Sequence, residues 1–266
     1  MAEILAGGVR FHVQRLAAHR AVRTGPEHPV VFIHGLGLDN LSSFYTTLAN
    51  PVAQAGADVI LYDQRGHGLS ERPHAGYRIS DSVADLVAIL GALDVDVPVH
   101  LVGHSYGGAI ALSFALAYPE RVASMLLIEA HVPIPGWGEQ MAANIRRVER
   151  ELGDSDWGRQ MVSIRKYARL AAVGKNLINR TTFMNDLLAT EPLSERDLRM
   201  FTAPVRAVYG EHSDVLSHAH LLGDLLPRYT LTVLPDLDHF VLAKDAQVLR
   251  AIVLDWFATR IPVGVR

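Results

Sequence analysis

The stretch Val99-His-Leu-Val-Gly-His-Ser-Tyr-Gly-Gly108 decides the fold. Its first four residues form an apolar run that predicts a short buried strand, and residues 108–117 predict a helix that ends before a proline. Between strand and helix stands a G-x-S-x-G motif centred on Ser105. This order predicts a sharp turn that presents the serine hydroxyl at the top of a sheet. Ser105 is therefore a candidate nucleophile, and the N–H of Tyr106 at the helix start is a candidate donor to developing negative charge.

Composition limits the possible classes of protein. The 266 residues suffice for one catalytic domain with an insertion, and 49% hydrophobic residues can build a sizeable core. The formal net charge of −3 gives no basic excess, so we expect no nucleic-acid partner. No cysteine is present, which excludes disulfides and thiol chemistry. The first residues show neither a secretory signal nor a membrane anchor, so we expect a cytoplasmic protein with no membrane partner.

Four segments occur in an order that resembles the α/β-hydrolase family over nearly the whole chain. They are His34–Gly37, Asp63–Ser70, Gly103–Gly108, and Asp214 followed by His239. The resemblance implies an α/β fold in which helices flank a mostly parallel eight-stranded sheet. It also implies a helical cap inserted into the core. The substrate does not follow from the family, because one fold hosts many chemistries.

Strand-like and helix-like segments alternate along most of the chain, which favours a parallel sheet with right-handed crossovers. Val9–Leu16 and Val30–Ile33 predict strands, and Ser82–Leu93 predicts a helix that opens with a capping box of Ser82 and Asp85. A turn-rich segment, residues 20–29, could close a first hairpin. Residues 241–259 predict one closing amphipathic helix.

The alternation breaks after residue 131, where no convincing strand occurs before residue 204. The resemblance makes residues 132–203 a helical cap and residues 1–131 and 204–266 the hydrolase core. Cap side chains usually select the substrate in this family, so the candidate pocket walls are Trp137, Trp157, Tyr167, Phe183 and Met184. Six basic residues are spread over this segment: Arg159, Arg165, Lys166, Arg169, Lys175 and Arg180. They could attract a carboxylate, a CoA-linked substrate or an acyl carrier protein, although a solvated helix face explains them more simply.

A serine hydroxyl needs an adjacent base to act as a nucleophile at neutral pH. His239 stands after the last predicted strand, where the family places its histidine. Asp214 follows the preceding strand and gives the family's order of serine, acid and histidine. Glu129 is the competing acid, because some members take the acid from the end of the earlier strand. The resemblance also makes the N–H of Leu36 the second oxyanion donor beside that of Tyr106.

Other histidines compete for roles near the site. His104 adjoins the serine but is expected to point elsewhere, and His212, His218 and His220 are expected at the surface. His67 and Arg65 are expected to brace their loop. No histidine spacing resembles a metal site, so neither a metal nor a cofactor is expected.

These residues predict a serine hydrolase that cleaves a carboxylic ester or thioester of a small or medium-sized substrate through an acyl-enzyme. Three alternatives stay open: hydrolysis of a carbon–carbon bond in a vinylogous diketo acid, acyl transfer to an alcohol, and a ligand receptor with slow turnover. The sequence does not reveal the oligomeric state.

Overall fold

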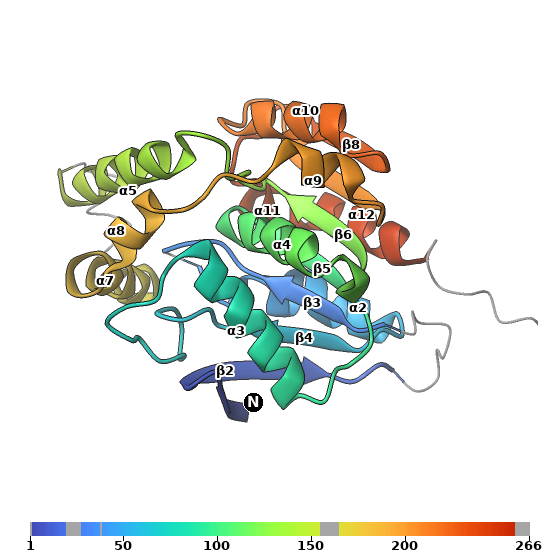
Figure 1. Cartoon of the computed structure of the whole chain (residues 1–266), viewed down its shortest axis with the longest axis horizontal. Helices are drawn as coiled ribbons and strands as arrows, with labels where there is room; N and C mark the ends of the chain where they lie inside the picture. Colours follow the sequence, from blue (N-terminus) through green and yellow to red (C-terminus); the bar gives the residue numbers. More distant parts are fainter. Residues whose placement is uncertain (1, 20–27, 38, 155–164, 259–266) are drawn as a thin grey trace, which may run out of the picture.

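The computed structural model describes residues 2–19, 28–37, 39–154 and 165–258, without the side chains of 148–149, 151–154 and 165–171. Eight strands form one sheet in the order β1-β2-β4-β3-β5-β6-β7-β8 (Figure 1). The strands are β1 (Ala2–Ala6), β2 (Val9–Leu16), β3 (Val30–Ile33), β4 (Val59–Tyr62), β5 (Val99–His104), β6 (Val122–Ile128), β7 (Val205–Gly210) and β8 (Tyr229–Leu234). The strands from β4 to β8 in this order are parallel, whereas β2 pairs antiparallel with both β1 and β4. The predicted fold class, a mostly parallel eight-stranded sheet flanked by helices, is confirmed.

The first hairpin is formed by β1 and β2, which turn at Gly7 and Gly8. Both glycines have positive φ, 55° and 80°, a backbone region that glycine adopts without steric cost. The sequence analysis did not anticipate β1, because its five residues do not alternate cleanly between buried and exposed. Residues 20–27 of the segment proposed to close a hairpin lie outside the described residues.

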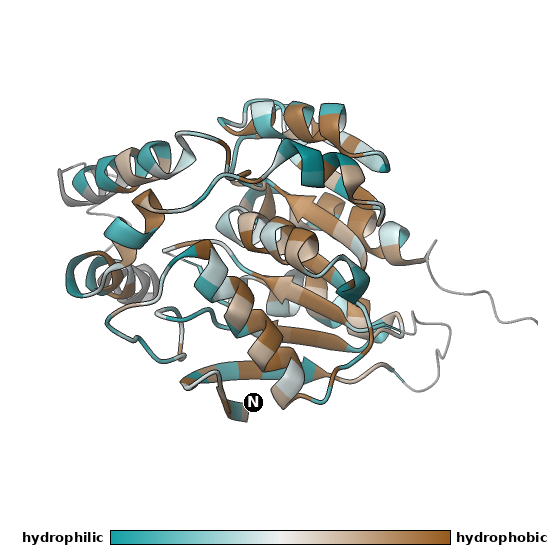
Figure 2. Ribbon diagram, viewed as in Figure 1, coloured by the Kyte–Doolittle hydropathy of each residue, from teal (hydrophilic) through white to brown (hydrophobic). Residues whose placement is uncertain are grey.

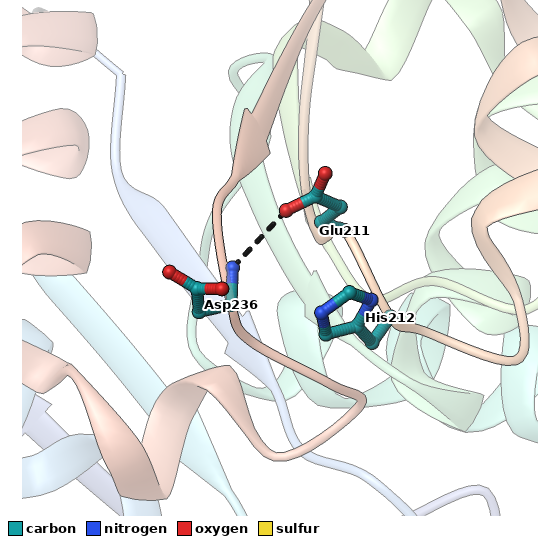
Figure 3. Close-up of side chains that lie close together, drawn as sticks. All are labelled: Glu211, His212 and Asp236. Atoms are coloured by element: carbon teal, nitrogen blue, oxygen red, sulfur yellow. Dashed lines mark hydrogen bonds between the residues drawn. The ribbon is translucent and has the colours of Figure 1, made fainter.

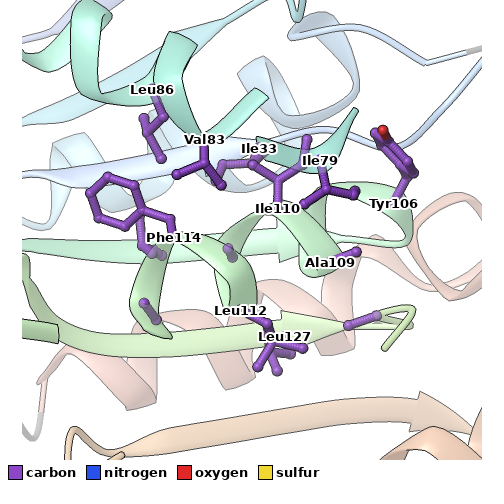
Figure 4. Close-up of a cluster of buried hydrophobic side chains, with 14 of the residues drawn as sticks. Ile33, Ile79, Val83, Leu86, Tyr106, Ala109, Ile110, Leu112, Phe114 and Leu127 are labelled. Atoms are coloured by element: carbon purple, nitrogen blue, oxygen red, sulfur yellow. The ribbon is translucent and has the colours of Figure 1, made fainter. Parts of the chain in front are cut away.

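Helices cover both faces of the sheet, and alternate residues along each central strand supply the two cores. In β3, Val31 and Ile33 face the cluster formed with α3 (Ile79–Ala92), α4 (Tyr106–Ala117) and α10 (Leu216–Leu225). Val30 and Phe32 face the opposite cluster with η1 (Tyr45–Ala49), α2 (Asn50–Gln54), α11 (Val241–Lys244) and α12 (Ala246–Ala258). Figure 2 shows the apolar colour concentrated on the central strands, and Figure 4 shows α3, α4 and the strands meeting in the first cluster.

Two helix predictions need correction. The helix predicted from Ser82 begins three residues earlier, at Ile79, and its start is held by Asp81, whose carboxylate accepts the N–H of Arg78 at 2.9 Å. Ser82 and Asp85 are buried inside that helix, so they form no capping box. The closing helix is divided into α11 and α12 at Asp245, where φ is −142°.

Between β6 and β7 the described residues contain only helices and connecting segments: α5 (Trp137–Asp154), α7 (Arg165–Arg180), α8 (Phe183–Leu188) and α9 (Glu195–Met200). Figure 1 shows α5, α7 and α8 beyond the end of the sheet toward which β6 points. Contacts connect α7 and α8 to the loops at that end of the sheet. Leu177 lies against Gly66, the carbonyl of Arg180 bonds His74, and the carboxylate of Asp186 accepts the N–H of Tyr77 at 3.0 Å. In the described part of the chain, no helix is long and apolar enough to cross a bilayer.

The backbone is tightly packed at the turn between β5 and α4. A Cβ on Gly107 would lie 2.2 Å from the carbonyl oxygen of Ile33, and one on Gly103 would lie 2.7 Å from the carbonyl oxygen of Gly107. A Cβ on Gly108 would lie 2.3 Å from the Cβ of Ala130. Helix α4 therefore packs directly against the ends of β3 and β6, and no side chain fits between them.

Replacing Gly107 with alanine should lower the free energy of unfolding by at least ~2 kcal/mol, because the methyl group would displace the backbone of β3. The matched control is Gly91→Ala, at an exposed position inside α3 where a Cβ meets nothing within 4 Å. That change should raise the free energy of unfolding by about 0.5–1 kcal/mol. Urea unfolding of both variants checks the pair. Similar effects of the two substitutions would contradict the packing argument.

Candidate active site

Ser105 stands at the turn from β5 into α4 with a strained backbone. Its φ is 53° and its ψ is −119°, a conformation that a non-glycine residue adopts only when its surroundings impose it. Its N–H donates to the carbonyl of Ile128 at 3.0 Å, and its own carbonyl accepts the N–H of His131 at 3.1 Å. The backbone is thus held from both sides, and the hydroxyl is left for a side-chain partner.

That partner is His239, in the loop between β8 and α11. The hydroxyl oxygen of Ser105 lies 3.0 Å from Nε2 of His239. The other ring nitrogen, Nδ1, lies 3.1 Å from Oε2 of Glu129 and 3.7 Å from Oδ1 of Asp214. The structure therefore brings Ser105 and His239 together, as the sequence predicts, and gives the hydrogen bond from Nδ1 to Glu129 instead of Asp214.

The two carboxylates differ sharply in environment. Glu129 is fully buried and accepts hydrogen bonds from the N–H of Gly210 at 2.5 Å and from the hydroxyl of Ser213, as well as from His239. A buried carboxylate with several donors is held in one orientation. The side chain of Asp214 is 62% exposed, and its distance from Nδ1 exceeds that of a hydrogen bond. The preceding residue explains the exposure of Asp214: the hydroxyl of Ser213 binds Glu129, and the chain then turns Asp214 toward solvent.

Leu36 and Tyr106 contribute the two backbone N–H groups that the sequence analysis assigned to an oxyanion hole. Neither N–H has a hydrogen-bond acceptor in the described part of the chain. The amides on either side of Leu36 are both occupied: the N–H of Gly35 donates to Asp39 at 2.7 Å, and the N–H of Gly37 donates to Nε2 of His67 at 3.1 Å. The loop is thus fixed at two points, and the amide between them is free to bind a substrate oxygen.

Buried side chains hold the loop of Leu36 in place. His67 is buried and bonds the carbonyl of Arg65 through Nδ1, which sets the tautomer that accepts from Gly37. Burial lowers the pKa of His67 to about 4, with a further contribution from nearby His34. Arg65 forms a two-point ion pair with buried Asp85. Both residues brace their loop, as expected from the sequence.

Asp39 and His104 were not recognised in the sequence. The carboxylate of Asp39 lies 3.2 Å from Nδ1 of His104, next to Ser105, and the ring of His104 is stacked 6.2 Å from that of His239. The pKa of Asp39 is held well below its usual range: burial alone would raise it, but the hydrogen bond from His104 and the charges of His34 and His104 outweigh burial. The expectation that His104 points away from the site is wrong. The sequence offered one signal for this pair, namely that Asp39 is an acidic residue only five positions after His34.

His218 is also not where the sequence analysis put it. It is 6% exposed, and its Nδ1 accepts the N–H of Val132 at 3.1 Å. His212 and His220 are exposed, as expected. The ring of His131 lies 5.6 Å from that of His239 and 5.9 Å from that of His218, so imidazole rings form a row beside the candidate triad.

The candidate pocket residues have different positions. Trp137 is 2% exposed, and its ring stacks 6.1 Å from that of Tyr106. Phe183 is buried against Tyr77, and Met184 packs on the same core, so both belong to the packing of the helical segment. Trp157 and the side chain of Tyr167 lie outside the described residues, as do the side chains of Arg159, Arg165, Lys166 and Arg169. Lys175 and Arg180 are exposed.

One group of side chains could hold a cation. Ligand atoms of Glu211, His212 and Asp236 all lie within 4.8 Å of one another, and Figure 3 shows them on the loops after β7 and β8. All three are exposed, and Glu211 already accepts the N–H of Asp236 at 3.2 Å. Their side chains form no hydrogen bond to Ser105, His239 or either nearby carboxylate, so this group stands apart from the candidate triad.

A serine hydroxyl, an imidazole, a buried carboxylate and two free N–H groups thus lie together in this part of the molecule. The chain belongs to the alpha/beta hydrolase fold family, whose model matches residues 28–162. Among curated relatives, 2-hydroxy-6-oxo-2,4-heptadienoate hydrolase of Pseudomonas putida is 35% identical over 128 residues, 48% of this chain and 43% of the relative. Putative carbamate hydrolase RutD of Variovorax paradoxus is 40% identical over 107 residues, 40% of either chain. These matches thus span about two fifths of each relative.

Among solved structures, Est816, an N-acyl homoserine lactone degrading enzyme, is 26% identical with a TM-score of 0.74. The match covers 96% of this chain and 100% of that one. The likeness therefore extends over the whole fold, including the helical segment between β6 and β7.

Exchanging Glu129 for glutamine should reduce kcat by about 10⁴, because the amide no longer fixes the tautomer of His239 or stabilises its charged form. The matched change Asp214→Asn should reduce kcat less than about tenfold, because that side chain is exposed and makes no hydrogen bond to His239. Steady-state kinetics on an aryl ester measures both. If Asp214→Asn were the more damaging change, the acid would come from the loop after β7.

His67 should make the stability of the protein sensitive to acid. The unfolded ring takes up a proton near pH 6.5, whereas the folded ring does so only near pH 4, so stability present above pH 6.5 is lost as the pH falls to about 4. The loss amounts to about 3 kcal/mol. In His67→Gln the free energy of unfolding should vary less over this range, while the exposed control His220→Gln should follow the parent chain. Equal pH dependence in all three proteins would contradict the assignment.

Proposed function

We propose that the protein is a serine hydrolase of carboxylic esters, acting through Ser105, His239 and Glu129. The single observation that carries the proposal is the continuous hydrogen-bonded line from the serine hydroxyl to His239, at 3.0 Å, and on to the buried carboxylate, at 3.1 Å. Glu129 replaces Asp214, the acid expected from the sequence, because it is the carboxylate that His239 reaches. Asp214 lies close enough to add a favourable charge without orienting the ring.

The chemistry follows from these positions. His239 removes the proton of Ser105 as the hydroxyl attacks the carbonyl carbon of the ester. The N–H groups of Leu36 and Tyr106 bind the oxyanion that forms. His239 then returns the proton to the leaving alcohol, and water activated by the same ring releases the acid. Glu129 stabilises the charged imidazole in both steps. No step requires a cofactor.

The comparisons support a hydrolase, and the likeness to Est816 supports an ester as its substrate. Est816 acts on N-acyl homoserine lactones, which are uncharged cyclic esters, so a lactone or an open-chain ester is the substrate class we propose. Thioesters react by the same steps and belong to the panel to be tested. We further propose that residues 132–203 act as a cap that selects the substrate, with Trp137, whose ring stacks on that of Tyr106 next to Ser105, as a wall residue.

Hydrolysis of a carbon–carbon bond is the second candidate, because the relative from Pseudomonas putida has that kind of substrate in its name. Such a substrate carries a carboxylate, which calls for a cationic partner. Among the described residues, no lysine or arginine lines the cavity beside the candidate triad, which favours the ester. Release of product from a vinylogous diketo acid at a rate above that from esters would reverse this order.

A fluorophosphonate probe should label the protein stoichiometrically at Ser105, because the probe requires an activated serine. Ser105→Ala should abolish both labelling and ester hydrolysis. Peptide mapping of the labelled chain and a burst assay with an aryl acetate supply the measurements. A burst without steady turnover would indicate a receptor or an acyltransferase lacking its acceptor, and labelling elsewhere would refute the assignment of Ser105.

A further inference from the structure

The loop that carries Leu36 lies directly against the turn that carries Ser105. A Cβ on Gly35 would lie 3.0 Å from Oδ2 of Asp39 and 3.2 Å from Nδ1 of His104. It would also lie 3.3 Å from the Cβ of Ser105. Neither Asp39 nor His104 takes part in the proton transfers proposed for the triad, so their place at this contact points to another role.

The carboxylate of Asp39 joins the two segments that meet there. Its Oδ2 accepts the N–H of Gly35 at 2.7 Å and lies 3.2 Å from Nδ1 of His104. Its Oδ1 accepts the N–H of Asn40 at 2.9 Å and the hydroxyl of Ser43. Burial would raise the pKa of Asp39, but the hydrogen bond from His104 and the charges of the nearby histidines hold it well below its usual range. The carboxylate is therefore ionised and acts only as an acceptor.

His104 therefore donates through Nδ1, and this bond sets the direction of its ring. Nε2 of the same ring has no hydrogen-bond partner among the residues that the structure describes. The side chains of His104 and Asp39 are 14% and 13% exposed, so the bond between them is largely shielded from solvent. Because His104 ends β5 and immediately precedes Ser105, the carboxylate of Asp39 is connected to the nucleophile turn itself.

The peptide group between Gly35 and Leu36 carries the free N–H of the candidate oxyanion hole. Nε2 of buried His34 accepts the N–H of Gln64 at 3.0 Å. Nδ1 of His34 therefore carries the ring proton and donates it to the carbonyl of Gly35 at 2.7 Å. In a trans peptide the N–H points away from the carbonyl of the same group. Hydrogen bonds on both sides of Gly35 thus fix the direction of the N–H of Leu36.

We propose that Asp39 is a positioning residue that sets the two oxyanion donors at the correct distance from each other. The donors come from separate segments, the N–H of Leu36 from the loop after β3 and the N–H of Tyr106 from the start of α4. Both must reach one oxygen at a distance of about 3 Å. Asp39 holds the first segment directly and the second through His104. The inference rests on the proposed hydrolase function and deepens it, since it concerns the oxyanion formed at the same site.

Phenyl acetate and O-phenyl thionoacetate, in which sulfur replaces the carbonyl oxygen, test this role. Sulfur is a weak hydrogen-bond acceptor, so the thiono ester gains less from the oxyanion donors. In full-length Asp39→Ala, kcat for phenyl acetate should fall about 10²-fold, the effect of losing one such donor, with KM little changed. The kcat for the thiono ester should fall less than about tenfold, so the ratio of the two kcat values should drop at least about tenfold. Phenol release measures both reactions.

His104 supplies a second test that leaves the carboxylate in place. His104→Asn puts an amide N–H near the position of Nδ1, so it should keep the kcat ratio of the parent chain. His104→Leu removes the donor and should lower the ratio toward that of Asp39→Ala. Circular dichroism and complete fluorophosphonate labelling, even if slower, establish that each variant is folded and has a reactive Ser105.

Asp58→Ala is the matched control. Asp58 also accepts a backbone N–H, that of Ala18 at 3.0 Å. It precedes the N-terminal end of β4, whereas Ser105 follows the C-terminal end of β5, and both strands run parallel to β3. This substitution should therefore leave the kcat ratio of the parent chain unchanged.

A parent-like ratio in folded, labelled Asp39→Ala or His104→Leu would overturn the proposal. So would an equal loss of kcat for both esters, which indicates damage to the triad or the fold, and so would a lowered ratio in His104→Asn. If Asp39→Ala does not fold, the two variants of His104 decide the question. These outcomes leave the proposed hydrolase intact, since they require a reactive Ser105. A parent chain that reacted with neither the fluorophosphonate nor phenyl acetate would instead refute the proposed function.

Discussion

Direct contact between backbones at the start of α4 is the constraint on which the site depends. Gly107 touches the end of β3, and Gly108 touches Ala130 just beyond β6. The same contacts that force Ser105 into its strained conformation also fix the two neighbouring strand ends. One of those ends continues into the loop of Leu36, and the other carries Glu129 and His131. Ser105, Leu36 and Glu129 are therefore positioned by one packing arrangement and not by three independent ones.

The fold was predictable because its signals are local. The buried run of β3 and the G-x-S-x-G turn depend on residues adjacent in sequence, and Val9–Leu16 and Val30–Ile33 have the bounds that their apolar patterns indicate. The strand β1 and the break at Asp245 were missed, since neither leaves a strong periodicity. The start of α3 was misplaced because Asp81 caps it in place of the serine that follows.

The site was predictable only in part, for a physical reason. Ser105 and His239 are identified by their places after β5 and β8. Glu129 and Asp214 stand equally well after β6 and β7, and the choice depends on side-chain direction. Glu129 has a positive φ of 51° just beyond its strand, and Ser213 binds the buried carboxylate, so Asp214 is left exposed. The pairing of Asp39 with His104 likewise joins residues 65 positions apart.

The two carboxylates near Nδ1 of His239 have a consequence for how such a site can change over generations. A lineage that loses the acid on one strand would ordinarily pass through an inactive ancestor before another acid arises. Here a second carboxylate already stands 3.7 Å away, so further substitutions that turn its side chain toward the ring could transfer the role. The chain can therefore drift at Asp214 while Glu129 orients the histidine, and at Glu129 only once that turn has occurred. This redundancy offers a route by which relatives of one fold come to carry the acid on different strands.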